Sequence, residues 1–283
     1  MLELHKDKIP SKLLKFFEPA KCGVCYVCRM VDIFAEVKRV LKYDGTLFLN
    51  LGDTYIGGGR GFDSPKQMTN KGTEGIKNLR LAPMNGLKAK DLVGIPWMVA
   101  FALRTDGWYL RQDIIWHKPN PMPESVTDRC TKSHEYIFLM SKSAQYYFDN
   151  EAIKEPYTKP MNRWGGQKLK ANGKSDWDKG TGQSTYRDRD MRPDPNGRNK
   201  RSVWTVTTKP YSGAHFATFP PDLILPCILA GCPAGGTILD PFMGAGTTAL
   251  VAKKNNCNYV GCELNQTYIE IAQRRLSQEY LFT

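Results

Sequence analysis

Apolar residues recur at helical and strand-like spacings along most of this chain. Ile33, Phe34, Val37, Val40 and Leu41 form the core-facing stripe of a helix over residues 32–41. Further helices are predicted over residues 92–104, 222–230 and 247–254, and buried strands at residues 47–51, 108–117, 134–139, 237–239 and 259–262. Within these strands we expect Trp116, Phe138 and Leu139 in the core. Mixed strands and helices predict an α/β fold.

The last two predicted strands and the helix between them form one βαβ unit. A turn containing Gly244 and Gly246 follows the first strand, and Glu263 ends the second. Glycine has no Cβ, so such a turn lets a ligand approach the backbone closely. A carboxylate about 20 positions after a glycine turn is the layout that binds an adenosine-type cofactor, with Glu263 accepting hydrogen bonds from the ribose hydroxyls. The spacing does not name the cofactor, and a nucleotide site of an oxidoreductase fits it too.

The whole motif around this turn is more specific than its two glycines alone. Asp240-Pro241-Phe242-x-Gly244-x-Gly246-Thr247-Thr248 resembles the AdoMet-binding motif of DNA amino-methyltransferases, which methylate cytosine N4 or adenine N6. Its place near the C-terminus resembles the permuted β class, in which the catalytic half precedes the cofactor half. The resemblance covers about residues 28–276. It implies a doubly wound, Rossmann-like AdoMet-dependent methyltransferase sheet, circularly permuted, with a basic insertion.

A second segment extends the expected cofactor site. Residues 212–220 resemble the family segment that precedes the cofactor motif and closes over the methionine end of AdoMet. The alternative for its histidine is a polar contact at a helix start, with no ligand. The resemblance thus implies AdoMet contacts from His215, Ala217, Thr218, Asp240, Pro241, Phe242, Gly244, Gly246, Thr247, Thr248, Glu263 and Asn265.

Candidate catalytic residues follow the strand at residues 47–51. Polar groups at the carboxyl end of a strand face the ligand crevice of a parallel sheet. Asn50, Asp53 and Tyr55 are therefore candidates for contact with the cofactor or the target base, and the run D-G-T-L-F-L-N-L-G-D-T-Y resembles the same family. A plain turn cap is the alternative for Asp53.

The family's main catalytic motif, Asp/Ser/Asn-Pro-Pro-aromatic, is missing from its expected place before the first helix. The only Pro-Pro pair is Pro220-Pro221, in the later segment, and residues 1–21 contain no equivalent. Three explanations stay open: the chain begins inside its parental gene, another segment supplies the motif, or catalysis has been lost. A catalytically silent AdoMet- or DNA-binding protein is therefore one alternative to a DNA methyltransferase, and an RNA or small-molecule methyltransferase is another.

Charge points to a polyanionic partner. The 283 residues carry a net charge of +12, and the pI is about 9.3. Between Lys154 and Arg201, thirteen Lys/Arg stand against six Asp/Glu, with tryptophans and tyrosines interleaved. A basic, aromatic stretch of this kind favours a DNA-recognition insert, and the family places its recognition region in the same interval; a solvated surface insertion is the alternative.

The chain is accordingly expected to form one domain over residues 1–283. It would comprise a catalytic half (28–153), a basic target-recognition insert (154–203) and an AdoMet-binding half (204–283). Double-stranded DNA is the expected partner, and a homodimer is possible on this scheme. DNA contacts are expected from Lys118, Asn120, Arg163, Lys168, Lys170, Arg187 and Arg189.

Location and metal content follow from what the sequence does not contain. No apolar run could span a bilayer and no signal-peptide core is present, so we expect a cytoplasmic protein, bacterial or phage-encoded. The eight cysteines are scattered, some at expected core positions such as Cys227 and Cys262. Cys22, Cys25 and Cys28 have a spacing that could bind zinc, but no fourth ligand is near. We therefore interpret this segment as one that simply leads into a helix, and we expect no metal.

Overall fold

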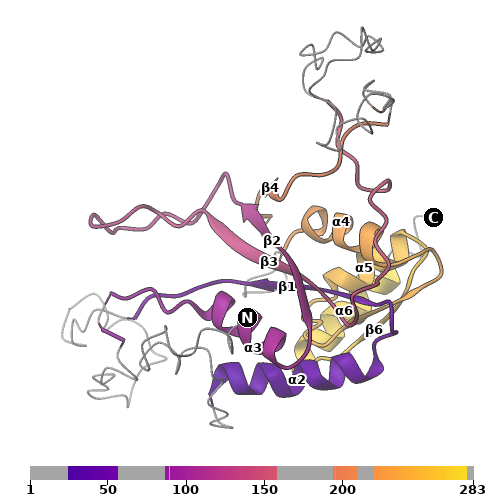
Figure 1. The fold of residues 1–283 in the computed structure, drawn as a ribbon, viewed down its shortest axis with the longest axis horizontal. Coiled ribbons are helices and arrows are strands. Elements are labelled where there is room, and N and C mark those ends of the chain that lie inside the picture. Colours follow the sequence, from indigo (N-terminus) through magenta and orange to yellow (C-terminus); the bar gives the residue numbers. More distant parts are fainter. Residues whose placement is uncertain are drawn as a thin grey trace, which may run out of the picture.

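The computed structural model describes residues 25–56, 87–88, 90–157, 194, 196–209 and 219–278. Every helix and strand predicted above is present, with shifted ends, and two further elements, β4 and α6, were not predicted. In chain order they are α2 (Tyr26–Val40), β1 (Thr46–Leu51), α3 (Ile95–Thr105), β2 (Tyr109–His117), β3 (His134–Ser141), β4 (Val203–Thr205), α4 (Pro221–Gly231), β5 (Thr237–Asp240), α5 (Thr247–Lys254), β6 (Asn258–Gly261) and α6 (Gln266–Gln278) (Figure 1).

The strands form two sheets in the described part of the chain. One has the order β1-β3-β2-β4, and the other pairs β5 with β6 in parallel. The α/β class is confirmed, but the expectation of parallel neighbours for β1 was wrong, because β1 and β2 both pair antiparallel with β3. Strand β4 runs parallel to β2. The carboxyl ends of β1, β2 and β4 therefore still lie at one edge of the sheet, beside the start of β3.

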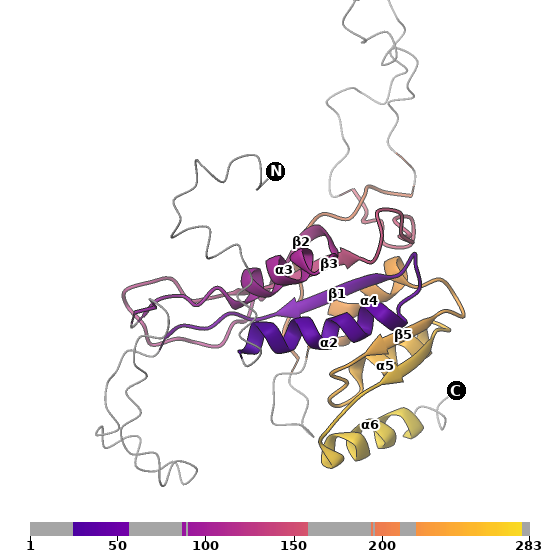
Figure 2. The same cartoon turned by 60° about the horizontal axis from the view of Figure 1, so that its bottom comes forward.

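Both faces of the four-stranded sheet are covered. Phe34 of α2 and Leu103 of α3 pack against one face with Phe138, and α2 lies along β1 in both views (Figure 2). Leu223 of α4 packs against the opposite face with Ile137. Neighbouring residues of β3 thus enter different cores, as the two-residue period of a strand requires. Trp116, Phe138 and Leu139 are all buried, as predicted.

Helix α4 also connects the two sheets. Its Leu223 belongs to the core of the larger sheet, whereas Ile228 packs with Val251 of α5 and Cys257 ahead of β6. Leu239 of β5 contacts the core beneath α2 and α3. The glycine turn after β5 is thereby held against the same body that carries β1.

One cysteine expectation was confirmed and one was wrong. Cys227 is buried in α4, and burial raises the pKa of its thiol to about 12. Cys262 is exposed, because it directly follows β6, whose four residues are all exposed and whose only partner among the described strands is β5. None of the helices in the described ranges is long and apolar enough to cross a membrane.

Candidate functional site

The turn after β5 is shaped by the carboxylate of Asp240. Its Oδ1 accepts a hydrogen bond from the backbone N–H of Phe242 at 2.9 Å, and its Oδ2 accepts one from the hydroxyl of Thr248 in α5. Pro241 lies between the two bonded segments. The side chain that ends β5 therefore fixes both the start of the turn and the first turn of the next helix.

The two glycines of this turn have different surroundings. Both have positive φ, +52° at Gly244 and +77° at Gly246, where side chains are strained. A Cβ on Gly246 would lie 2.9 Å from the Cβ of Ala272 in α6, so this glycine permits helix packing. A Cβ on Gly244 would meet no atom closer than 4.0 Å. Space for a ligand therefore lies at Gly244, and the expected backbone approach is possible there.

Glu263 joins the ends of the two parallel strands. Its Oε2 accepts a hydrogen bond from the N–H of Gly244, and its Oε1 accepts one from the N–H of Asn265, both at 2.8 Å. Asn265 in turn accepts a hydrogen bond from the N–H of Thr267, so it caps α6. An ionised carboxylate has about four acceptor positions, so Glu263 keeps capacity for further donors.

Apolar surface flanks this carboxylate. Leu264 is fully exposed, and Phe242 is 53% exposed with its ring 6.3 Å from that of Phe34. Thr247, by contrast, is buried and accepts a hydrogen bond from Arg275 of α6 at 2.9 Å. Of the predicted cofactor residues, Thr247 therefore faces the protein, and Phe242 lies at the open side with Glu263.

The candidates at the end of β1 are held by backbone contacts. The amide nitrogen of Asn50 donates to the carbonyl of Tyr136 at 3.0 Å. The Oδ1 of Asp53 accepts hydrogen bonds from the N–H groups of Gly94 at 2.9 Å and Ile95 at 3.1 Å. Asp53 therefore caps the start of α3, which supports the turn-cap alternative and gives this side chain a structural task.

Tyr55 lies further out on the same edge and contacts a cation that the sequence did not single out. The guanidinium of Arg129 lies 3.8 Å from the centre of the Tyr55 ring and also pairs with Glu124. Tyr55 forms an isolated antiparallel bridge with Leu92. Arg129 comes from the hairpin between β2 and β3, so this contact links two segments far apart in the sequence.

Lys118 and Asn120 are both held by contacts with the protein, although Asn120 is exposed. The ammonium of Lys118 pairs with Glu135 and lies 4.2 Å from the centre of the Trp116 ring. Asn120 exchanges two hydrogen bonds with the backbone of Thr208, accepting at 3.0 Å and donating at 3.2 Å. Sequence reasoning missed Glu135 because its role depends on β3 returning beside β2, which no local pattern encodes.

Several predicted site residues fall outside the described ranges. They are Cys22 and the cofactor candidates His215, Ala217 and Thr218, together with the DNA candidates Arg163, Lys168, Lys170, Arg187 and Arg189. For the Cys22 cluster, the described members show that Cys25 caps α2, its sulfur accepting from the N–H of Cys28 and lying 3.4 Å from the Cys28 sulfur. The described residues contain no group of three or more potential metal ligands.

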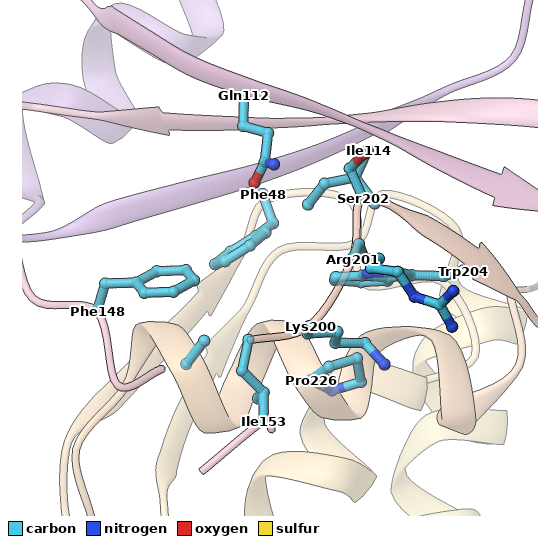
Figure 3. A pocket seen from close by; sticks show the side chains of 11 residues that line it. Phe48, Gln112, Ile114, Phe148, Ile153, Lys200, Arg201, Ser202, Trp204 and Pro226 are labelled. Atoms are coloured by element: carbon cyan, nitrogen blue, oxygen red, sulfur yellow. The ribbon is translucent and has the colours of Figure 1, made fainter. Parts of the chain in front are cut away.

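One cavity lies away from the glycine turn, between β2 and α4 (Figure 3). Its walls include Phe48, Ile114, Trp204 and Pro226, and its volume is about 30 Å³. That is room for one or two water molecules and far too little for a nucleoside. The candidate cofactor site is therefore the open surface around Gly244 and Glu263.

Comparisons with known proteins agree with one another. Residues 24–274 match the family described as DNA methylase (N6_N4_Mtase). The type II methyltransferase M.Cfr9I of Citrobacter freundii is 46% identical over 254 residues, which are 90% of this chain and 72% of that protein. M.SmaI of Serratia marcescens is 45% identical over 251 residues, 89% of this chain and 74% of that protein.

Solved structures show the same fold. The PvuII DNA methyltransferase (cytosine-N4-specific) superimposes with a TM-score of 0.55 at 16% identity, covering 91% of this chain and 74% of that one. A Thermus thermophilus protein solved with S-adenosyl-L-methionine gives a TM-score of 0.52 at 17% identity, covering 89% of this chain and 77% of that one.

The cap formed by Asp53 gives a testable distinction. Asp53→Ala removes the acceptor for Gly94 and Ile95 and should lower the free energy of unfolding by about 1–2 kcal/mol. Asp53→Asn keeps an acceptor oxygen in the same place and should cost less than about 0.5 kcal/mol. Denaturant unfolding measures both. Equal losses in the two variants would show that the charge, not the cap, is what the fold uses.

Proposed function

The chain belongs to the DNA methylase family, and we propose that it transfers the methyl group of AdoMet to an exocyclic amine of duplex DNA, at cytosine N4 or adenine N6. The observation that carries this proposal is the turn from Asp240 to Thr248, held open at Gly244 by Glu263. The relatives with 45–46% identity are type II DNA methyltransferases.

The residues around the turn fit AdoMet. Glu263 has acceptor positions left for the ribose hydroxyls, and exposed Phe242 and Leu264 are proposed to offer apolar surface for a purine ring. The open side of Gly244 leaves room for the methionine part at the backbone. His215, Ala217 and Thr218 are proposed to close over that part. The neighbour solved with AdoMet supports this choice of cofactor.

When bound, AdoMet would supply an electrophilic methyl group to the exocyclic amine of the target base, which would lose a proton in exchange. The task of the protein is to place the amine in line with the carbon–sulfur bond of that methyl group. Asn50 is oriented by its bond to Tyr136, and its amide oxygen is an acceptor suited to an amine N–H. Asp53 positions this segment by capping α3. Tyr55, beside Arg129, is proposed to contact the extruded base.

DNA contact is proposed for the basic insert, residues 154–203, between the catalytic half (28–153) and the AdoMet half (204–283). Arg163, Lys168, Lys170, Arg187 and Arg189 would neutralise phosphates. Lys118 and Asn120, fixed at the edge beside β1, are proposed to hold the strand near the target base.

The proposal is tested by methyl transfer from labelled AdoMet to several duplex DNAs, with single-stranded RNA and free nucleosides as competitors. Incorporation into duplex DNA, on nitrogen of cytosine or adenine, is the expected result. Intact AdoMet binding without transfer to any DNA would favour a catalytically silent binding protein. Preferential labelling of RNA or nucleosides would favour the other alternative.

Cofactor binding should depend on Glu263. Glu263→Ala is expected to weaken AdoMet binding by about 1–3 kcal/mol, because charge-assisted hydrogen bonds to the ribose and to the turn are lost. Glu270→Ala is the matched control, since Glu270 lies on α6 and is exposed. Isothermal titration calorimetry compares the two. An unchanged affinity in Glu263→Ala would remove this carboxylate from the site, and a preference for NAD would contradict the cofactor.

DNA affinity should fall steeply with salt, because Lys and Arg of the insert displace counterions from phosphates. Deleting residues 168–192 should abolish DNA binding and leave AdoMet binding nearly intact. Fluorescence anisotropy at several salt concentrations measures the first effect, and calorimetry checks the second. If DNA affinity survives the deletion, the insert is a solvated loop and the DNA-binding surface lies elsewhere.

A further inference from the structure

The two segments that flank residues 158–193 lie side by side. Glu155 and Arg198 form an antiparallel bridge, exchanging backbone hydrogen bonds of 3.0 and 2.9 Å. The hydroxyl of Tyr157 donates to the carbonyl of Gly197 at 3.2 Å. Gly197 has φ +107°, and a Cβ there would lie 2.5 Å from the carbonyl oxygen of Glu155. We call the paired segments, residues 151–157 with residues 194 and 196–201, the stem.

Ion pairs hold the stem across its two segments. The side chain of Lys154 is only 8% exposed, and its ammonium pairs with Asp194 on the opposite segment and with Glu151 at 2.6 Å. Glu155 accepts hydrogen bonds from Arg198, at 2.9 Å, and from Arg201. Three cations of this basic region are therefore matched by three carboxylates within the stem.

The pKa values of Lys154, Glu155 and Asp194 are shifted in the direction that favours their charged forms. The hydrogen bond from Lys154, and then that from the N–H of Asn196, hold the pKa of Asp194 below its usual value. The same contact with Asp194 raises the pKa of Lys154. Burial raises the pKa of Glu155, but hydrogen bonds from Arg201 and Arg198 outweigh it and lower the pKa overall.

The stem is attached to the sheet through β4. The indole N–H of Trp204 donates to the carbonyl of Arg201 at 2.8 Å, and the ammonium of Lys200 lies 5.2 Å from the Trp204 ring centre. Trp204 is 6% exposed and packs in the core with Ile114 of β2. The direction in which the stem leaves the protein is thus set by a buried residue of the sheet.

Beneath the stem lies the small cavity of Figure 3. Ile153, Lys200 and Arg201 line it from the stem, and Phe48 and Pro226 line it from the body. Protein interiors rarely leave voids larger than a water molecule. The stem and the body thus meet around a space large enough for one or two water molecules.

We propose that the stem is a positioning element for DNA recognition, because its closure fixes the two segments that flank residues 158–193 against each other and against the sheet. The inference rests on the proposed function. Reading base edges requires side chains in a fixed register on the duplex, whereas phosphate attraction does not. Opening the stem should therefore reduce sequence discrimination much more than cofactor binding.

A reversible disulfide across the stem distinguishes the effect of holding its segments together from the effect of its charged side chains. Glu155 and Arg198 are directly opposite in a hydrogen-bonded pair, where Cα atoms lie about 5.5 Å apart, within the range of a disulfide. In the double variant Glu155→Cys/Arg198→Cys, the reduced and oxidised forms lack the same two charges and differ only in the covalent link that holds the two segments of the stem together. The full-length wild type, treated with the same reductant and oxidant, controls for the native cysteines.

Binding is measured on two duplexes of equal composition. Wild-type protein first selects a preferred sequence from a randomised duplex pool, and a scrambled version serves as reference. The reduced double variant should lose at least about tenfold of the preference, and oxidation should restore it to within about threefold of wild type. AdoMet affinity, measured in parallel, should stay within about twofold and shows that the fold is intact.

Two results would overturn the stem proposal: full preference in the reduced variant, or a loss that oxidation does not restore. The second would show that Glu155 and Arg198 act through charge, for instance by direct contact of Arg198 with phosphate. If wild type selects no sequence from the pool but methylates duplex DNA, the stem proposal fails and the proposed function stands; if it does neither, the proposed function fails as well.

Discussion

The candidate site depends on one carboxylate that joins two strand ends. Glu263 accepts hydrogen bonds from the N–H of Gly244 in the turn after β5 and from Asn265 ahead of α6. The turn has positive φ angles at Gly244 and Gly246, which glycine adopts without strain, and its N–H groups need acceptors. The carboxylate at the end of β6 accepts from the N–H of Gly244 in the turn and leaves the open side of this glycine accessible. The proposed cofactor site follows from this bond more than from any preformed cavity.

The second constraint is the direction of β3. Because β3 runs antiparallel between β1 and β2, the carboxyl ends of those two strands meet its first residues at one edge. This brings Asn50 to the carbonyl of Tyr136 and Lys118 to Glu135. Residues expected to be catalytic or to contact DNA are thus already bonded to the protein. On our proposal, these bonds orient the side chains in advance and lower the entropy lost when DNA binds.

The cations of the basic region have two different roles. In the stem, carboxylates neutralise Lys154, Arg198 and Arg201, so these cations contribute structure. The remaining excess of positive charge lies in residues 158–193, where the sequence favours contact with phosphates. Lys and Arg therefore stabilise the stem, and on our proposal those of residues 158–193 contribute affinity for DNA.

The sequence by itself determined the local elements. The turn from Asp240, the helix over residues 247–254 and the buried strand residues Trp116 and Phe138 could all be predicted, because each depends on neighbours a few positions away. Strands and helices that were not predicted are β4 and α6. Strand β4 has only three residues, too few to show a pattern, whereas α6 has an amphipathic face that the prediction overlooked.

Only the tertiary structure decided which strands pair and which groups each polar side chain contacts. The antiparallel place of β3, the cap that Asp53 gives to α3, the exposure of Cys262 and the ion pairs of the stem all join residues distant in sequence. Such contacts are set by how whole elements pack against each other. Residue spacing constrains only the conformation within an element.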